Sequence, residues 1–125
     1  MPLSIVLPDG DRVEGFASVA RGYWQRMLGL MGQRGLPRAC GLLFPRCSSI
    51  HTYWMRFPID VVWLSAPLAD GRTMGVTRLD RSIPRGRVSI APKGTWGVLE
   101  LPGGTLDETP KRVEVDRLTL GDIRQ

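Results

Sequence analysis

Glycine and proline residues are spread along the whole chain and leave little room for long helices. The 125 residues include 15 glycines and 10 prolines, a fifth of the chain. Glycine ends regular elements through its conformational freedom, and proline does so through its fixed φ angle and missing amide hydrogen. Because they recur between most apolar segments, they divide the chain into short pieces joined by turns.

The pieces between these residues have the character of β-strands. Residues 4–7 precede the turn sequence Pro8-Asp9-Gly10-Asp11, and residues 12–17 then alternate in polarity, which predicts a β-hairpin. A second hairpin turn is expected at residues 69–72. Further strands are expected at residues 41–44, 50–55, 59–64, 73–79, 89–91, 95–101 and 113–120.

One segment has helical periodicity instead. Apolar side chains recur at helical spacing over residues 22–32, namely Trp24, Met27, Leu28 and Met31. Gly29 weakens this helix, and Pro37 prevents its continuation. We therefore expect a single domain over residues 1–125 of mainly β structure with a minor α contribution. Its architecture would be a small, strongly bent sheet or a partly closed β-barrel with one short helix.

The composition, 42% hydrophobic and 23% charged, is that of a soluble globular protein. The net charge of +5 permits contact with nucleic acid or an anionic surface without establishing it. The amino terminus has no basic stretch followed by an apolar run, and no apolar segment approaches the ~20 residues of a membrane span. These features predict a cytoplasmic protein. Export is the alternative if a leader has been removed from the chain.

Five short motifs follow one another along the chain. They are Arg26-x-x-Gly29-Leu30-Met31-Gly32-x-Arg34-x-Leu36, Gly41-Leu42-Leu43-Phe44, His51-Thr52-x-Trp54-Met55-Arg56-Phe57-Pro58-Ile59-Asp60, Val98-Leu99-Glu100-Leu101-Pro102-x-Gly104 and Gly121-Asp122. In this order they resemble the DUF192 family, also called COG1430, of small bacterial and archaeal proteins. The resemblance implies a compact, mainly β fold without an assigned activity. The link over residues 56–60 is shorter than in several members of the family.

The third motif contains the only histidine of the chain. On a strand, His51, Tyr53 and Met55 would share one face, and Thr52 would lie on the other. A lone histidine is most simply a half-buried group that binds a backbone carbonyl or Asp60. The functional alternative is a pocket wall in which the imidazole and a carboxylate orient a polar ligand.

Two carboxylates are set among apolar neighbours. Asp60 precedes the apolar run 61–64, and Glu100 lies inside the run 98–101. Burial of a carboxylate is costly unless the group has a partner, and Arg26 or Arg56 could supply structural ion pairs. The alternative is a pair of acids with raised pKa values that could exchange protons.

The two cysteines raise the question of a metal site. Cys40, Cys47, His51 and Met55 follow a C-x6-C-x3-H-x3-M pattern, but methionine is a poor zinc ligand and the cysteine spacing is unusual. We therefore interpret the cysteines as buried thiols and predict neither a metal nor a cofactor. A Cys40–Cys47 disulfide would require an oxidising compartment.

These patterns predict a non-catalytic module that binds a small polar ligand or a partner protein. The expected site is a cleft bordered by His51, Thr52, Met55, Asp60 and Glu100, with Arg26 balancing the acids. One alternative is a hydrolase that uses His51 with Asp60 or Glu100. Another is RNA or anion binding through a basic loop from Arg78 to Arg87, although a solvated loop is the simpler interpretation. The ligand and the oligomeric state are not specified by the sequence.

Overall fold

Nine strands make up the part of the chain that the computed structural model describes, which comprises residues 1–19, 40–53, 57–116 and 118. They are β1 (Pro2–Val6), β2 (Arg12–Val19), β3 (Cys40–Phe44), β4 (Ser49–His51), β5 (Ile59–Leu64), β6 (Thr73–Ile83), β7 (Val88–Ile90), β8 (Gly97–Pro102) and β9 (Arg112–Val115). The helix predicted over residues 22–32 lies outside these ranges. Within them, no helix is long and apolar enough to cross a membrane.

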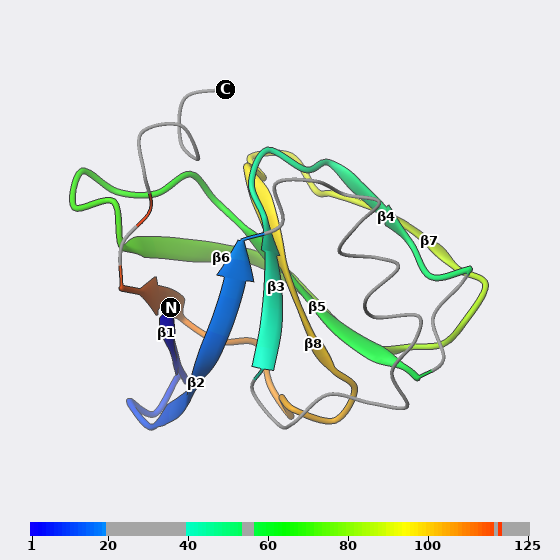
Figure 1. Cartoon of the computed structure of the whole chain (residues 1–125), viewed down its shortest axis with the longest axis horizontal. Helices are drawn as coiled ribbons and strands as arrows, with labels where there is room; N and C mark the ends of the chain where they lie inside the picture. The colour runs from blue at the N-terminus through cyan, green and yellow to red at the C-terminus, as the bar shows by residue number, and fades with distance from the viewer. Residues whose placement is uncertain (20–39, 54–56, 117, 119–125) are drawn as a thin grey trace.

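Seven of the strands form a closed barrel in the order β1-β2-β3-β8-β5-β6-β9, and β9 pairs with β1 to complete it (Figure 1). Neighbouring strands are antiparallel except for β2 and β3, which are parallel. The predicted mainly β fold is confirmed, and the barrel closes fully where a partly closed one was allowed. Closure removes the unpaired edges that an open sheet would leave in these strands.

The predicted amino-terminal hairpin is confirmed by β1 and β2. Its turn is held by a hydrogen bond of 2.8 Å from Leu7 N to Asp11 O. The φ angle of Gly10 is +92°, in a region that side chains with a Cβ atom rarely adopt. The glycine in the turn sequence therefore has a specific conformational reason.

Strand alternation separates two apolar layers. Inward-facing residues from all seven barrel strands fill the interior, among them Leu43, Val62 and Leu99. The opposite face of β3, β8 and β5 carries a second cluster, with Phe44, Trp63 and Val98 among its members. Because both faces of these three strands are covered, their sequences are almost continuously apolar.

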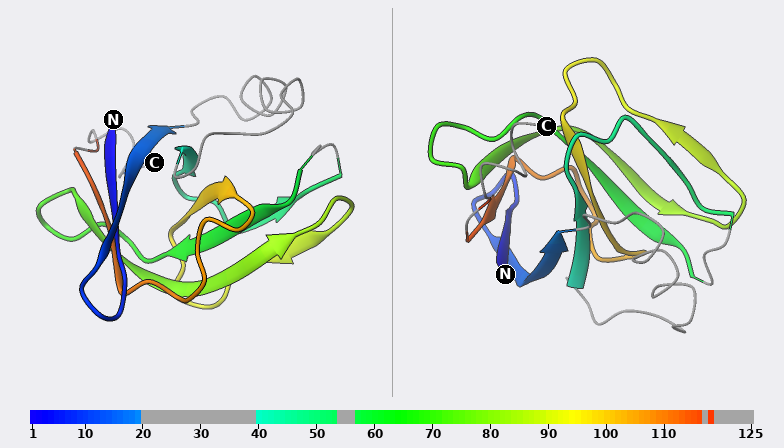
Figure 2. Two further views of the ribbon diagram at one scale, coloured as in Figure 1. Left: turned by 90° about the horizontal axis from the view of Figure 1, so that it is seen from below. Right: turned by 45° about the horizontal axis from the view of Figure 1, so that its top comes forward.

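The second cluster lies beneath a two-stranded ribbon formed by β4 and β7, outside the barrel. Ile50 of β4 is 2% exposed and packs into this cluster. The ribbon extends away from β1 and β2 in each view (Figure 2). Its two strands come from segments predicted to be β, but their separate sheet was not predicted.

Strand β6 is longer than predicted and corrects one expectation. It continues to Ile83, so Arg78 and Arg81 lie on a strand and not in a basic loop. Only residues 84–87 connect it to β7. Over residues 76–83 only Val76, Leu79 and Ile83 are apolar, and they do not alternate with polar residues, so this part of the strand has no period-two signal.

Candidate functional site

The register between β5 and β8 places the two predicted acids on opposite faces of the sheet. Asp60 is paired with Leu101, whereas Glu100 is paired with Val61. Directly paired residues share a face, and neighbours along a strand alternate. Asp60 therefore faces the barrel interior with Leu101, and Glu100 faces the layer beneath the ribbon. A single cleft lined by both acids is not formed.

Asp60 is a structural group that holds loops at one end of the barrel. It is fully buried, and its carboxylate accepts hydrogen bonds from the backbone amides of Ser82 (2.7 Å), Leu106 (2.9 Å) and Gly104 (3.3 Å). Ser82 has a φ of +47° at the register shift between β5 and β6. Among the described residues the partners of Asp60 are backbone amides, which stabilise an irregular strand. Arg26 and Arg56, the partners expected from the sequence, lie outside these residues.

Glu100 has the opposite character. It is 4% exposed and lies in a row of directly paired residues that runs across neighbouring strands. In this row its neighbours are Leu42 of β3 and Val61 of β5. Its Oε2 atom has no hydrogen-bond partner among the described residues. Burial raises the pKa of its carboxyl group to about 8, because the charged form loses the solvation of water. At neutral pH the group is mostly the neutral acid, which can donate and accept a hydrogen bond.

Asp80 lies in the same row and, unlike Glu100, has several hydrogen-bond donors. It is paired with Val61 across from Glu100. Its carboxylate accepts hydrogen bonds from Trp63 Nε1 (3.0 Å), Arg78 Nε (2.9 Å) and Ser89 Oγ (2.7 Å). Burial acts to raise the pKa of Asp80, but these hydrogen bonds outweigh it and the pKa is lowered. Asp80 was not among the residues predicted to form the site.

The Cys47 thiol belongs to the neighbourhood of Glu100. Burial raises its pKa, a hydrogen bond of 3.1 Å from Sγ to Ser49 O lowers it, and the charge of Glu100 raises it further. The thiol is therefore protonated and weakly nucleophilic at neutral pH. Cys47 packs against the layer beneath the ribbon and is half-buried, where a buried thiol was predicted.

Cys40 lies at the opposite end of β3 from Cys47. Strand β3 runs from Cys40 to Phe44, about 13 Å at the usual rise of about 3.3 Å per residue. Cys47 donates its backbone amide to Trp96 O, next to the far end of that strand. A disulfide requires Cα atoms within about 7 Å, so this geometry does not support one.

His51 and Thr52 lie at the end of β4 with their side chains on opposite faces. Thr52 is buried, and its hydroxyl donates to Pro84 O (2.6 Å) and accepts from Arg87 N (2.9 Å). His51 stacks on Tyr53 with 5.5 Å between ring centroids, as expected for residues that share a face. That face is opposite to buried Ile50, so His51 points away from the Glu100 layer.

The predicted site is therefore reduced to Glu100. Arg26, Met55 and Arg56 lie outside the described residues, and His51, Asp60 and Glu100 face three different surroundings. A hydrolase that combines them would need the three side chains to converge, and the register separates them. In the ranges that the structure describes, no group of three or more His, Cys, Asp or Glu residues could hold a metal ion.

Three of the four arginines in the segment expected to bind anions, Arg78 to Arg87, make contacts within the molecule. Arg78 forms an ion pair with Asp80 (2.9 Å) and lies 6.0 Å from the Trp63 ring centroid. Arg81 donates to Leu106 O (3.1 Å), and Arg85 donates to Tyr53 O (3.0 Å). These contacts leave few cations arranged to follow a phosphate backbone.

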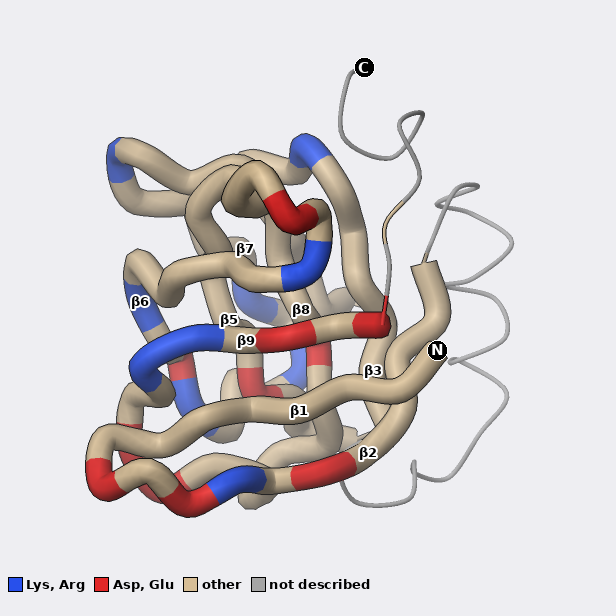
Figure 3. The backbone as a smooth tube through the Cα atoms, turned by 90° about the vertical axis from the view of Figure 1, so that its left-hand side faces the viewer, with Lys and Arg blue, Asp and Glu red and all other residues tan. Residues whose placement is uncertain are grey.

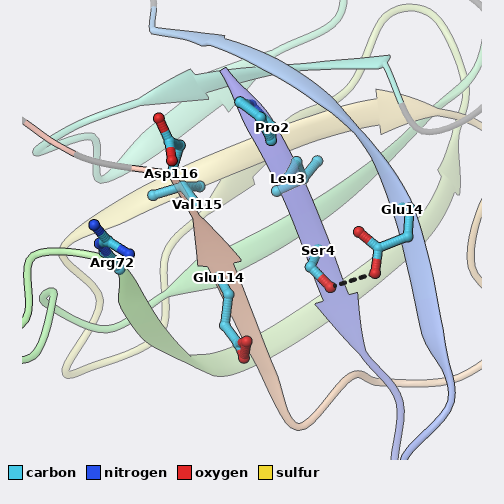
Figure 4. A pocket seen from close by; sticks show the side chains of 8 residues that line it. All are labelled: Pro2, Leu3, Ser4, Glu14, Arg72, Glu114, Val115 and Asp116. Atoms are coloured by element: carbon cyan, nitrogen blue, oxygen red, sulfur yellow. Dashed lines mark hydrogen bonds between the residues drawn. The ribbon is translucent and has the colours of Figure 1, made fainter.

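A hollow of about 190 Å³ lies elsewhere, over β1, β2 and β9. Its side chains are shown in Figure 4 and are Pro2, Leu3, Ser4, Glu14, Arg72, Glu114, Val115 and Asp116. Ser4 donates to Glu14 (2.9 Å), and Arg12 donates to Glu114 (2.9 Å). Charges of both signs are interspersed on this side of the barrel (Figure 3). This satisfied surface network does not point to a ligand.

Comparisons with known proteins place these observations in a family. The model of DUF192, described as "Uncharacterized ACR, COG1430", matches residues 5–115. No curated protein matches the chain.

Two solved structures share the fold. One is a Sinorhizobium meliloti 1021 protein described as a candidate transcription regulator, with 20% identity, a TM-score of 0.71 and coverage of 90% of this chain and 91% of its own. The other is a Novosphingobium aromaticivorans DSM 12444 protein of unknown function, with 22% identity, a TM-score of 0.69 and coverage of 91% and 84%. At these identities the likeness establishes the barrel alone.

Proposed function

The chain belongs to the DUF192 family, whose description names no activity, so we propose a function from the site itself. In this proposal the protein is a non-catalytic module that binds a small polar ligand at Glu100. The observation that carries this proposal is the buried carboxyl group whose Oε2 has no partner among the described residues. A buried polar atom without a hydrogen bond destabilises the fold, and a ligand that pairs with it would recover that loss.

The contrast with Asp80 supports this proposal. One cross-strand row contains two acids, and the fold provides Asp80 with three side-chain donors. Glu100, two strands away in that row, has only aliphatic neighbours on β3 and β5. Groups that reduce stability are concentrated at binding sites, because ligand recognition and stability place different demands on the same residue.

The surroundings of Glu100 favour a small, uncharged ligand with both a donor and an acceptor. The carboxyl group is mostly protonated at neutral pH because its pKa is about 8. Pairing it with a neutral amide or hydroxyl avoids the cost of burying a charge. Because Glu100 is only 4% exposed, the ligand must be small.

The experiment is a thermal-shift screen at pH 7 with small neutral amides and alcohols, together with their amine and carboxylate counterparts. We expect neutral compounds to raise the melting temperature of the wild type, because they bind only the folded state. Glu100→Leu should remove this response. Glu114→Leu, the same change on the surface of β9, should retain it.

The melting temperatures without ligand provide a second readout. Glu100→Leu should raise the melting temperature, because it replaces a buried acid, whose Oε2 has no partner in the described part of the chain, by an apolar group of similar size. A variant that is less stable than the wild type would assign Glu100 a structural role. Compounds that stabilise Glu100→Leu and the wild type equally would also contradict the proposal.

A further inference from the structure

The outer face of the ribbon exposes an apolar patch. Val88 and Ile90 of β7 are 56% and 69% exposed, and Tyr53, just after β4, is 48% exposed. Alternation places Val88 and Ile90 opposite Ser89, which faces the barrel. His51 is paired with Val88 and stacks on Tyr53. We call Tyr53, Val88, Ile90 and His51 the ribbon patch.

Strand β7 also has an open edge, since β4 is its only neighbour in the described sheet. A hydrogen bond from Thr52 N to Arg87 O marks a bonded pair of the β4–β7 ladder. Bonded and non-bonded pairs alternate in an antiparallel ladder, so the backbone N–H and C=O groups of Val88 and Ile90 point away from β4. Arg78 Nη2 donates to Ile90 O on that edge (2.8 Å), so the edge groups open to a partner are the two N–H groups and the carbonyl of Val88.

The charges around the ribbon patch have one sign. The segments 45–53 and 84–93, which contain both ribbon strands and their flanks, include no aspartate or glutamate. They carry four exposed basic residues, namely Arg46, Arg85, Arg87 and Lys93. Such a surface attracts an acidic partner, and it disfavours a second copy of this chain, which would bring like charges together.

From these observations we propose that the ribbon patch docks an acidic, extended segment of another protein. The segment adds a strand to the open edge of β7 and lays apolar side chains against Val88 and Ile90. A lipid surface would cover the same side chains without pairing the backbone groups of the edge. Nucleic acid would find one exposed aromatic ring, Tyr53, beside the aliphatic Val88 and Ile90, where base stacking uses several aromatic rings in succession. This docking site is independent of the ligand proposed for Glu100, which lies beneath the ribbon.

The experiment is an NMR titration of the ¹⁵N-labelled full chain with a capped seven-residue peptide that alternates glutamate and valine. We expect saturable shifts concentrated in β7 and its flanks. A peptide that alternates lysine and valine should produce none. The affinity should fall several-fold between about 50 and 300 mM salt, because screening weakens contacts between exposed charges.

Two variants test the location. Ile90→Lys changes a position that is 69% exposed and outside the core, and it should weaken binding of the acidic peptide about tenfold or more. Leu68→Lys, at a 61% exposed position in the loop between β5 and β6, should leave binding unchanged. Unchanged affinity in Ile90→Lys, absence of binding, or equal binding of the lysine peptide would overturn the proposal.

Two further measurements distinguish other occupants of the patch. Concentration-dependent dimerisation in sedimentation equilibrium that is lost in Ile90→Lys would assign the patch to a second copy. Binding to phosphatidylserine vesicles without a response to the acidic peptide would assign it to a membrane surface. Either result would overturn the proposed protein partner.

Discussion

At the scale of single residues, Glu100 makes stability depend on pH in an unusual direction. Its pKa in the folded state is about 8, against an ordinary value of 4.5. Between these two values the folded state binds more protons than the unfolded state, so the free energy of unfolding falls as pH rises. The stabilisation that protonated Glu100 gives to the fold is fully present below about pH 4.5 and is lost by about pH 8. Over this range the free energy of unfolding falls by an amount on the order of 5 kcal/mol.

We predict that Glu100→Gln removes this decline, because an amide does not titrate. The measurement is urea unfolding of wild type and variant at several pH values between 5 and 9. Other titrating groups contribute equally to both proteins, so the difference between the two curves isolates Glu100. Parallel curves for wild type and variant would mean that the carboxyl group is not shifted in the folded protein.

At the scale of elements, the contacts that hold the ribbon to the barrel include buried Ile50 and the hydrogen bonds of Asp80 and Arg78 to β7. Asp80 joins Trp63 of β5, Arg78 of β6 and Ser89 of β7. We predict that Asp80→Asn lowers the opening free energy of the ribbon amides by about 2 kcal/mol, since charge-assisted hydrogen bonds are lost. Amides of β1 and β9 should keep their protection.

Hydrogen exchange resolved by residue measures this difference. Asp107→Asn is the matched control, because Asp107 is exposed and lies 3.6 Å from Arg81 in a surface ion pair. Equal loss of protection in the ribbon and in β1 would show that Asp80 stabilises the whole fold and not the attachment of one element.

At the scale of the whole molecule, two apolar layers share one set of strands. Leu43, Val62 and Leu99 face the barrel interior, while Phe44, Trp63 and Val98 face the ribbon. Loss of β5 or β8 would expose both layers, so they cannot unfold separately. We predict a single cooperative transition in which NMR peaks of β1 and of β5 disappear at the same urea concentration. An earlier loss of the β5 peaks would indicate an independently unfolding layer.

The sequence by itself determined the local elements and the chemical character of the candidate site. The turn at residues 8–11, the hairpin around it and the apolar strands 41–44 and 59–64 follow from neighbours in the chain, because turn geometry and side-chain alternation are local properties. The placement of Glu100 and Asp60 among apolar residues could also be recognised from the sequence, because it concerns their immediate neighbours in the chain.

Only the tertiary structure decided what each acid does. A shift of one residue in register exchanges the two faces of a strand, and register depends on partners distant in sequence. Pairing with Leu101 turns Asp60 toward the backbone amides of Ser82 and Leu106, while pairing with Val61 places Glu100 in an apolar layer. Strand pairing also separated the ribbon from the barrel and exposed Ile90, because pattern alone does not choose between joining a closed sheet and lying outside it.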